Sequence, residues 1–185
     1  MSNLRLQLAM VLATIVMFAL MLVLNEWLFL KLEFVPGINW VYLPAGMRLL
    51  CTLLFGEAGA VGLLIVSWLV CFLHFFPNDF SRAFMGGILA TVAPYLAYKL
   101  SQQVFGLRAS LTNLTPKRLL VCVVAYSVAS PLLHHIWFFL HGDNINLVRG
   151  FLVMFVGDLT GTLIVIYTMK GLLSMLPVRR GYTAA

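Results

Sequence analysis

The sequence N-W-V-Y-L-P-A-G-M-R-L-L-C-T-L-L-F-G-E-A-G-A-V-G, residues 39–62, places a single arginine inside a run of apolar residues. This residue is Arg48, and an ionisable side chain within a membrane span costs about 2.5–3.5 kcal/mol on insertion scales. Such residues usually mark a pocket, a pathway or an internal ion pair. Asp158, in the sequence G-D-L-T-G, is the only acidic residue placed well inside another apolar run. We therefore expect an early and a late segment of the chain to meet around Arg48 and Asp158.

The composition predicts an integral membrane protein. Of the 185 residues, 62% are hydrophobic and 10% are charged, which leaves too much apolar surface for one soluble core. A net charge of +6 would suggest nucleic acid in a soluble protein. Here the basic residues lie at the ends of apolar runs, where they orient helices, so we expect no nucleic-acid binding. The cysteines lie in apolar runs without a C-x-x-C spacing, which predicts neither disulfides nor a zinc site: Cys51, Cys71 and Cys122.

Runs of about 17–25 mostly apolar residues predict six transmembrane helices in one domain, residues 1–185. The expected helices lie near 6–30, 40–55, 58–76, 83–100, 118–140 and 150–170. The first run is longer than the core of a signal peptide and lacks an A-x-A-like cleavage site, so we expect it to be retained. The predicted fold class is all-α, a polytopic membrane helix bundle.

The basic residues between these runs separate onto two sides of the membrane. One side carries Arg5, Lys99, Arg108, Lys117, Arg118, Lys170, Arg179 and Arg180, and the other carries Lys31, Arg82 and Arg149. The positive-inside rule therefore places both termini in the cytoplasm, and the expected location is the bacterial inner membrane. On the cytoplasmic side, the basic loop at 101–117 is the best surface for docking a partner.

The second and third expected helices are joined only by the sequence Gly56-Glu57-Ala58-Gly59, which predicts a tight hairpin. Glycines at 56, 59 and 62 would allow the two backbones to approach closely. A re-entrant pair, in which the two segments do not both cross the membrane, is the alternative interpretation.

Further polar side chains are expected at the level of the two buried charges. His74 follows Ser67 and Cys71 at helical spacing, and the fifth expected helix carries the polar stripe Ser127, Ser130, His134, Trp137 and His141. The sequence predicts an outward-opening pocket lined by Arg48, Asp158, His74, His134 and Ser130. Two interpretations stay open: the two charges form an ion pair that locks two helices, or one of them meets an anionic ligand or a proton.

Other classes of site are less well supported. A metal or haem site is not expected, because no H-x-x-x-H spacing is present and neighbouring histidines on a helix point about 100° apart. We expect no cofactor. The chain has no G-x-S-x-G, P-loop or H-E-x-x-H motif and no carboxylate pair placed for acid–base chemistry, so we do not expect an enzyme. A pH-sensing role of His134 remains an alternative, because imidazole titrates near neutral pH.

Two stretches carry a resemblance to a known family. Trp40, Pro44, Ala45 and Gly46 run into Phe55-Gly56 and Gly59-x-x-Gly62, and later come Gly157-Asp158-x-x-Gly161. Together they resemble the bacterial membrane-associated sensor domain of the first MASE type. The resemblance implies a sensory module that is usually fused to a cytoplasmic histidine kinase or diguanylate cyclase. This chain departs from the family in the separation of the tryptophan from the proline, in its shorter length, and in having no output domain attached.

The size and the six-helix topology also resemble the substrate-binding membrane components of energy-coupling-factor transporters, which work with a separate ATPase. The first helix offers only Ala9, Ala13 and Ala19 as the small residues that such a docking face requires. We therefore expect a sensory or ligand-binding membrane protein that relays a signal to a separate cytoplasmic kinase or cyclase. A small-molecule transporter, or the binding component of one with an ATPase partner, is the alternative.

Overall fold

A computed structural model describes residues 2–108, 111–142 and 146–175. Within these residues the fold is all-α apart from one short hairpin of two strands, β1 (Glu33–Val35) and β2 (Ile38–Asn39). Five helices are long and apolar enough to cross a membrane, so the chain is a multi-pass membrane protein. The predicted basic tail at Arg179 and Arg180 lies outside the described residues.

Four of the predicted helices correspond to one helix each. They are α1 (Ser2–Phe29), α3 (Phe80–Phe105), α4 (Pro116–His141) and α5 (Leu147–Met175). The ends of α3 and α4 carry ordinary capping residues. The side chains of Asp79 and Thr115 accept hydrogen bonds from the first turns, and Gly106 and Gly142 follow the last turns in the left-handed conformation.

The second and third predicted helices both fall within α2 (Leu43–Val70), which continues as a short π-helix at Cys71–Phe75. The described part of the chain therefore has five long apolar helices, whereas the sequence predicts six. However, Gly56 interrupts α2 with φ 57° and ψ −124°, a conformation that is not helical and that favours glycine. We call residues 43–55 the first arm and residues 57–70 the second arm.

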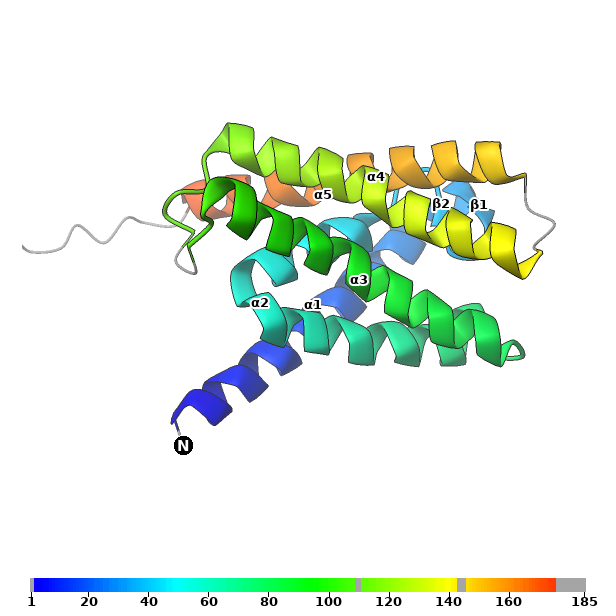
Figure 1. The fold of residues 1–185 in the computed structure, drawn as a ribbon, viewed down its shortest axis with the longest axis horizontal. Helices are drawn as coiled ribbons and strands as arrows, with labels where there is room; N and C mark the ends of the chain where they lie inside the picture. Colours follow the sequence, from blue (N-terminus) through cyan, green and yellow to red (C-terminus); the bar gives the residue numbers. More distant parts are fainter. Residues whose placement is uncertain (1, 109–110, 143–145, 176–185) are drawn as a thin grey trace, which may run out of the picture.

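The two arms fold back on each other. A Cβ atom on Gly59 would collide with the carbonyl oxygen of Cys51, eight residues earlier. Moreover, Arg48 and Cys71 line the same cavity, although a straight helix would separate residues 23 positions apart by about 35 Å. The predicted hairpin at Gly56 is thus present as a sharp bend (Figure 1).

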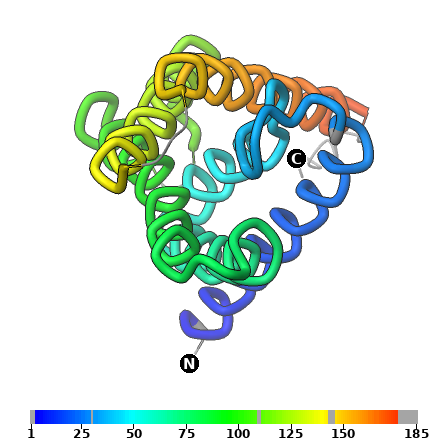
Figure 2. Tube along the Cα trace, turned by 90° about the vertical axis from the view of Figure 1, so that its right-hand side faces the viewer, coloured from blue at the N-terminus to red at the C-terminus, as the bar shows by residue number. Residues whose placement is uncertain are grey.

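The first arm runs through the middle of the bundle (Figure 2). The two arms of α2 pack against α1, α3 and α5, and α4 covers α3 and α5. The main core is built around fully buried apolar side chains from several helices, among them Phe18, Leu49, Leu63 and Tyr126. The beginning of α1 and the end of α5 lie at the same end of the molecule (Figure 1).

An extended segment, residues 38–42, leads into the first arm and lies against the middle of α5. Tyr42 N donates a hydrogen bond to the Gly157 carbonyl (3.1 Å), and a Cβ on Gly157 or Gly161 would collide with the carbonyl of Asn39 or Tyr42. The predicted helix near 40–55 therefore begins later, at Leu43. Glycine at 157 and 161 permits this close approach of an extended backbone to a helix.

Candidate functional site

Arg48 lies in the second turn of the first arm and is 7% exposed. Helical side chains lean toward the N-terminus of their helix, so Arg48 extends back toward the extended segment. Its guanidinium carbon lies 5.3 Å from the centre of the Phe18 ring and 5.2 Å from the centre of the Tyr42 ring. These distances are typical of cation–π contacts. Two aromatic rings from α1 and the extended segment therefore hold the guanidinium.

Among the described residues, none accepts a hydrogen bond from the Arg48 guanidinium, and no carboxylate forms a direct ion pair with it. The hydroxyl of Tyr126 lies beside the guanidinium, but its geometry is not that of a hydrogen bond. A guanidinium carries five N–H donors in a planar fork. The donors of this buried cation are thus available to an acceptor that the described residues do not supply.

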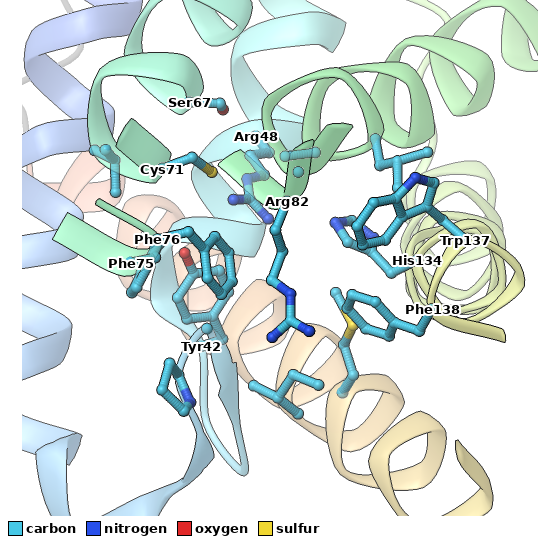
Figure 3. Close-up of a pocket in the computed structure, with 18 of the residues that line it drawn as sticks. Tyr42, Arg48, Ser67, Cys71, Phe75, Phe76, Arg82, His134, Trp137 and Phe138 are labelled. Carbon is cyan, nitrogen blue, oxygen red and sulfur yellow. The ribbon is translucent and has the colours of Figure 1, made fainter. Parts of the chain in front are cut away.

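Arg48 faces a cavity of about 50 Å³ (Figure 3). Most of its wall is aromatic or aliphatic, with Tyr42, Phe75, Phe76, Trp137 and Phe138 on it. Ser67 is also on the wall, is 1% exposed, and has a hydroxyl without a hydrogen-bond partner. A cavity of this size holds one or two waters or a group of about the size of a carboxylate. We call it the Arg48 cavity.

Arg82 brings a second guanidinium to the Arg48 cavity, and Figure 3 shows it extending between Phe76 and Phe138. Its Nε lies 3.5 Å from the Asp79 carboxylate, and its guanidinium carbon lies 5.7 Å from the centre of the Phe76 ring. Because Arg82 is in the first turn of α3 and its side chain is 30% exposed, it lies nearer the surface than Arg48. The cavity therefore has a buried cation and a second cation toward its opening.

Asp158 on α5 and Ser130 on α4 are buried polar residues in the neighbourhood of Arg48, and each is 1% exposed. Asp158 acts on Arg48 through space without a direct ion pair. Ser130 lies beside the Asp158 carboxylate, but neither Ser130 Oγ nor Asp158 Oδ2 has a partner in hydrogen-bond geometry. Asp158 thus offsets the charge of Arg48 without touching it. The N–H donors of Arg48 therefore have no acceptor among the described residues.

His134 lines the Arg48 cavity, and its Nδ1 lies 2.8 Å from the Ser130 carbonyl one turn earlier on α4. Because a carbonyl only accepts, we assign the proton of the neutral ring to Nδ1. His134 Nε2 then remains as an acceptor. His134 is 8% exposed, which fits a neutral imidazole in an apolar wall.

Of the five residues predicted to line one pocket, Arg48 and His134 line the Arg48 cavity, and Asp158 and Ser130 are buried nearby but are not on its wall. His74 lies in a different pocket. His74 Nε2 is 2.6 Å from Glu26 Oε1 near the C-terminal end of α1, and both side chains are partly exposed. His74 lines a neighbouring pocket of about 270 Å³ together with Glu26, Glu33 and Asn39. The π-helix at Cys71–Phe75 departs from α-helical spacing, so His74 turns toward α1 while Cys71 stays in the Arg48 cavity.

Sequence reasoning did not identify the aromatic partners of Arg48 or the contribution of Arg82. From sequence, Tyr42 is expected in an aromatic belt at the outer membrane boundary with Trp27 and Trp40. No sequence pattern indicates that Tyr42 or Phe18 contacts Arg48. The sequence indicates Arg82 only as a basic residue on the outer side, near the start of a helix after Asn78-Asp79. Within the described part of the chain, no group of three or more His, Cys, Asp or Glu side chains could hold a metal ion.

Comparisons with protein-family models, curated proteins and solved structures found no match. The resemblances to membrane-associated sensor domains and to transporter components therefore stay predictions from sequence. The fold and the cavity define the class of protein: an α-helical, multi-pass membrane protein whose core contains a buried arginine beside a small cavity.

Proposed function

We propose that this chain is a bacterial inner-membrane receptor that binds a small anionic ligand through Arg48 and relays its binding to a separate cytoplasmic partner. One observation carries the proposal: the Arg48 guanidinium is buried, faces a cavity and donates no hydrogen bond to a described residue. A buried charge without hydrogen-bond partners costs several kcal/mol, and a carboxylate matches the planar fork of arginine.

The electrostatics of the cavity favour an anion over a cation. Arg48 and Arg82 are the two charged residues on its wall, and both are positive. Asp158 offsets part of the charge of Arg48 but is not on the wall. Phe18, Tyr42 and the other rings exclude water, which strengthens an interaction between a carboxylate and a guanidinium. The Arg48 cavity has room for the acidic head of a ligand, and the aromatic rings at its edge would contact an apolar body that extends out of it.

The proposal includes six crossings of the membrane and places both termini in the cytoplasm. The two boundaries of the hydrocarbon core then lie near the two ends of α5. Gly157 lies eight residues after Arg149, or about 12 Å along α5, and the first arm adds about 20 Å. The sum matches the roughly 30 Å of a hydrocarbon core. Glu57, at the bend, then reaches the inner boundary, where its carboxylate forms an exposed ion pair with Lys99 (3.0 Å).

The relay would run through the two arms of α2. The first arm contributes Arg48 to the Arg48 cavity and the second contributes Ser67, so a ligand that contacts both would fix their separation. The arms meet at Gly56, next to Glu57 and Lys99 and on the same side as the basic loop at 101–117. A kinase or cyclase bound there would sense movement of the bend. Replacing Arg108 and Lys117, which are exposed, by Gln should reduce co-purification of such a partner.

A transporter remains the second candidate, and the extended segment at 38–42 favours it. Transporters often bind substrates where a helix is interrupted within the membrane, because the interrupted backbone can line a path. Here the first arm begins beside the middle of α5 rather than at the membrane surface. Uptake of a bound acid into proteoliposomes would favour transport, whereas binding without uptake would favour sensing.

Binding to the purified protein tests the proposal. The probes are the linear monocarboxylates from acetate to octanoate, and the readouts are thermal stability and calorimetric affinity in detergent. We expect stabilisation by at least one of these acids, and loss of at least tenfold in affinity in Arg48→Met. Arg149→Gln, which removes an exposed arginine on α5, is the matched control and should bind as the unmodified protein does. No binding by any acid, or equal binding by Arg48→Met, would reject the proposal.

A further inference from the structure

The pocket that contains His74 adjoins the Arg48 cavity. The two share Pro36, Tyr42 and Phe75 on their walls. Tyr42 separates them, because its ring stacks on the Arg48 guanidinium and the residue also lines the other pocket. With about 270 Å³, this second pocket is larger and more polar than the Arg48 cavity. We call it the Glu26 pocket.

The Glu26 pocket carries the opposite charge. Glu26 and Glu33 are its two carboxylates, and Glu33 Oε1 accepts a hydrogen bond from Gly37 N (3.1 Å), which holds this side chain over the β-hairpin. Among the described residues on the wall, His74 is the only basic side chain. Two carboxylates and one imidazole, near the outer ends of α1 and the second arm, make this pocket a place for a cation.

Asn39 gives independent support for a ligand in the Glu26 pocket. This residue is 8% exposed and lines the pocket, yet its side-chain amide forms no hydrogen bond with any described residue. Asn25, by contrast, uses its side-chain oxygen to accept a hydrogen bond from Leu43 N (2.8 Å). Asn39 itself is largely buried, so its side-chain amide can meet a polar group only within the Glu26 pocket. A polar ligand group there would form hydrogen bonds that the described residues do not provide.

We infer that the ligand is a zwitterion, with its acidic group at Arg48, its ammonium group between Glu26 and Glu33, and an apolar spacer that passes Tyr42 and Phe75. This inference rests on the proposed function, since it requires the acid at Arg48. The ammonium has three N–H donors, which match the two carboxylates and the Asn39 side-chain oxygen. The spacer lies against aromatic rings, where methylene groups lose contact with water favourably.

The test uses ω-amino acids from glycine to 8-aminooctanoate, each compared with the monocarboxylate and the monoamine of the same length. Affinities are measured by calorimetry on the full chain in detergent. In the unmodified protein we expect an ω-amino acid of intermediate length to bind at least tenfold more tightly than its matched acid, because shorter ones cannot reach past Tyr42. Glu26→Gln/Glu33→Gln should remove this advantage, whereas the control Arg149→Gln, outside both pockets, should keep it.

The outcomes separate this inference from the proposed function. If the acids bind in an Arg48-dependent way but no ω-amino acid binds more tightly, the zwitterion is rejected and the anionic ligand stands. If no acid and no ω-amino acid binds, both are rejected. Glu33→Gln alone keeps the Glu26 contact with His74, so its thermal stability should match that of the unmodified protein. If Glu33→Gln reduces the preference for the ω-amino acid over its matched acid, the inference is supported. If the double variant keeps the full preference, the inference is overturned.

Discussion

Arg48 and Asp158 are opposite charges buried in one core without a direct contact. Removing one charge leaves the other without compensation in a medium of low polarity, which costs about 3–5 kcal/mol for directly paired ions. Because these two interact at longer range, we expect Asp158→Asn to lower the free energy of unfolding by about 2–3 kcal/mol. In the double variant Arg48→Met/Asp158→Asn, the loss in free energy of unfolding should be smaller than the sum of the losses in Arg48→Met and Asp158→Asn. Thermal and chemical unfolding in detergent provide the measurement.

Tyr126→Phe is the control for this cycle, since Tyr126 is fully buried beside Arg48 and its hydroxyl has no partner. Removing an unpartnered hydroxyl should be neutral or slightly stabilising. Strictly additive losses in the Arg48 and Asp158 variants would show that the two charges do not interact.

The glycines of α5 allow a second prediction about single residues. Gly157→Ala and Gly161→Ala should each destabilise the protein by about 2 kcal/mol or more, because the new methyl group would collide with backbone at Asn39 or Tyr42. Gly171→Ala, on the same helix with nothing within 4 Å of its Cβ position, is the matched control. It should stabilise α5 by up to about 1 kcal/mol through helix propensity. Equal melting temperatures for all three variants would contradict the packing of the extended segment on α5.

Among the helices, α2 is the element whose behaviour depends on one backbone conformation. Gly56→Ala should destabilise the protein for two reasons: its φ of 57° favours glycine, and the added Cβ would lie 2.9 Å from the Tyr98 hydroxyl. Adding Tyr98→Phe removes that hydroxyl and should recover part of the loss, leaving the backbone strain. The melting temperatures of Gly56→Ala, Tyr98→Phe and the double variant measure the two contributions. Absence of any recovery would mean that the contact with Tyr98 is unimportant.

The same helix shows how far sequence reasoning extends. Hydropathy predicts four of the helices, and the glycines around Gly56 predict the turn there. The two charges inside apolar runs predict that the segments of Arg48 and Asp158 lie close together. The later start of α2 does not follow from the sequence, because Trp40, Val41 and Tyr42 are apolar enough to continue a helix. Hydrogen bonds to distant residues hold this segment extended, with Leu32 on one side and with Gly157 and Thr160 on α5 on the other. His74 was misplaced for a related reason. Helical spacing predicts a shared face with Ser67 and Cys71, but the chain becomes a π-helix at Cys71.

For the molecule as a whole, the question is whether the bend of α2 reaches the inner surface. In one topology both arms cross the membrane, and the extended segment completes the crossing of the first arm. Glu57 then lies on the same side of the membrane as Asn113. If α2 crosses once, Glu57 lies within the hydrocarbon. The exposed ion pair between Glu57 and Lys99 favours the inner surface, because a charged pair facing lipid would lack water.

Cysteine labelling distinguishes these topologies. Single cysteines at Glu57, Asn113 and Asn78 should be introduced into a variant in which the three buried native cysteines are replaced by alanine or serine. With six crossings, a membrane-impermeant maleimide should label position 78 in intact cells, and positions 57 and 113 only after the membrane is opened. Asn78 lies in the exposed turn between the second arm and α3, so it serves as the positive control for outer labelling. A position 57 that reacts from neither side would place the bend inside the membrane, and labelling of 78 and 113 from one side would overturn the arrangement of the helices.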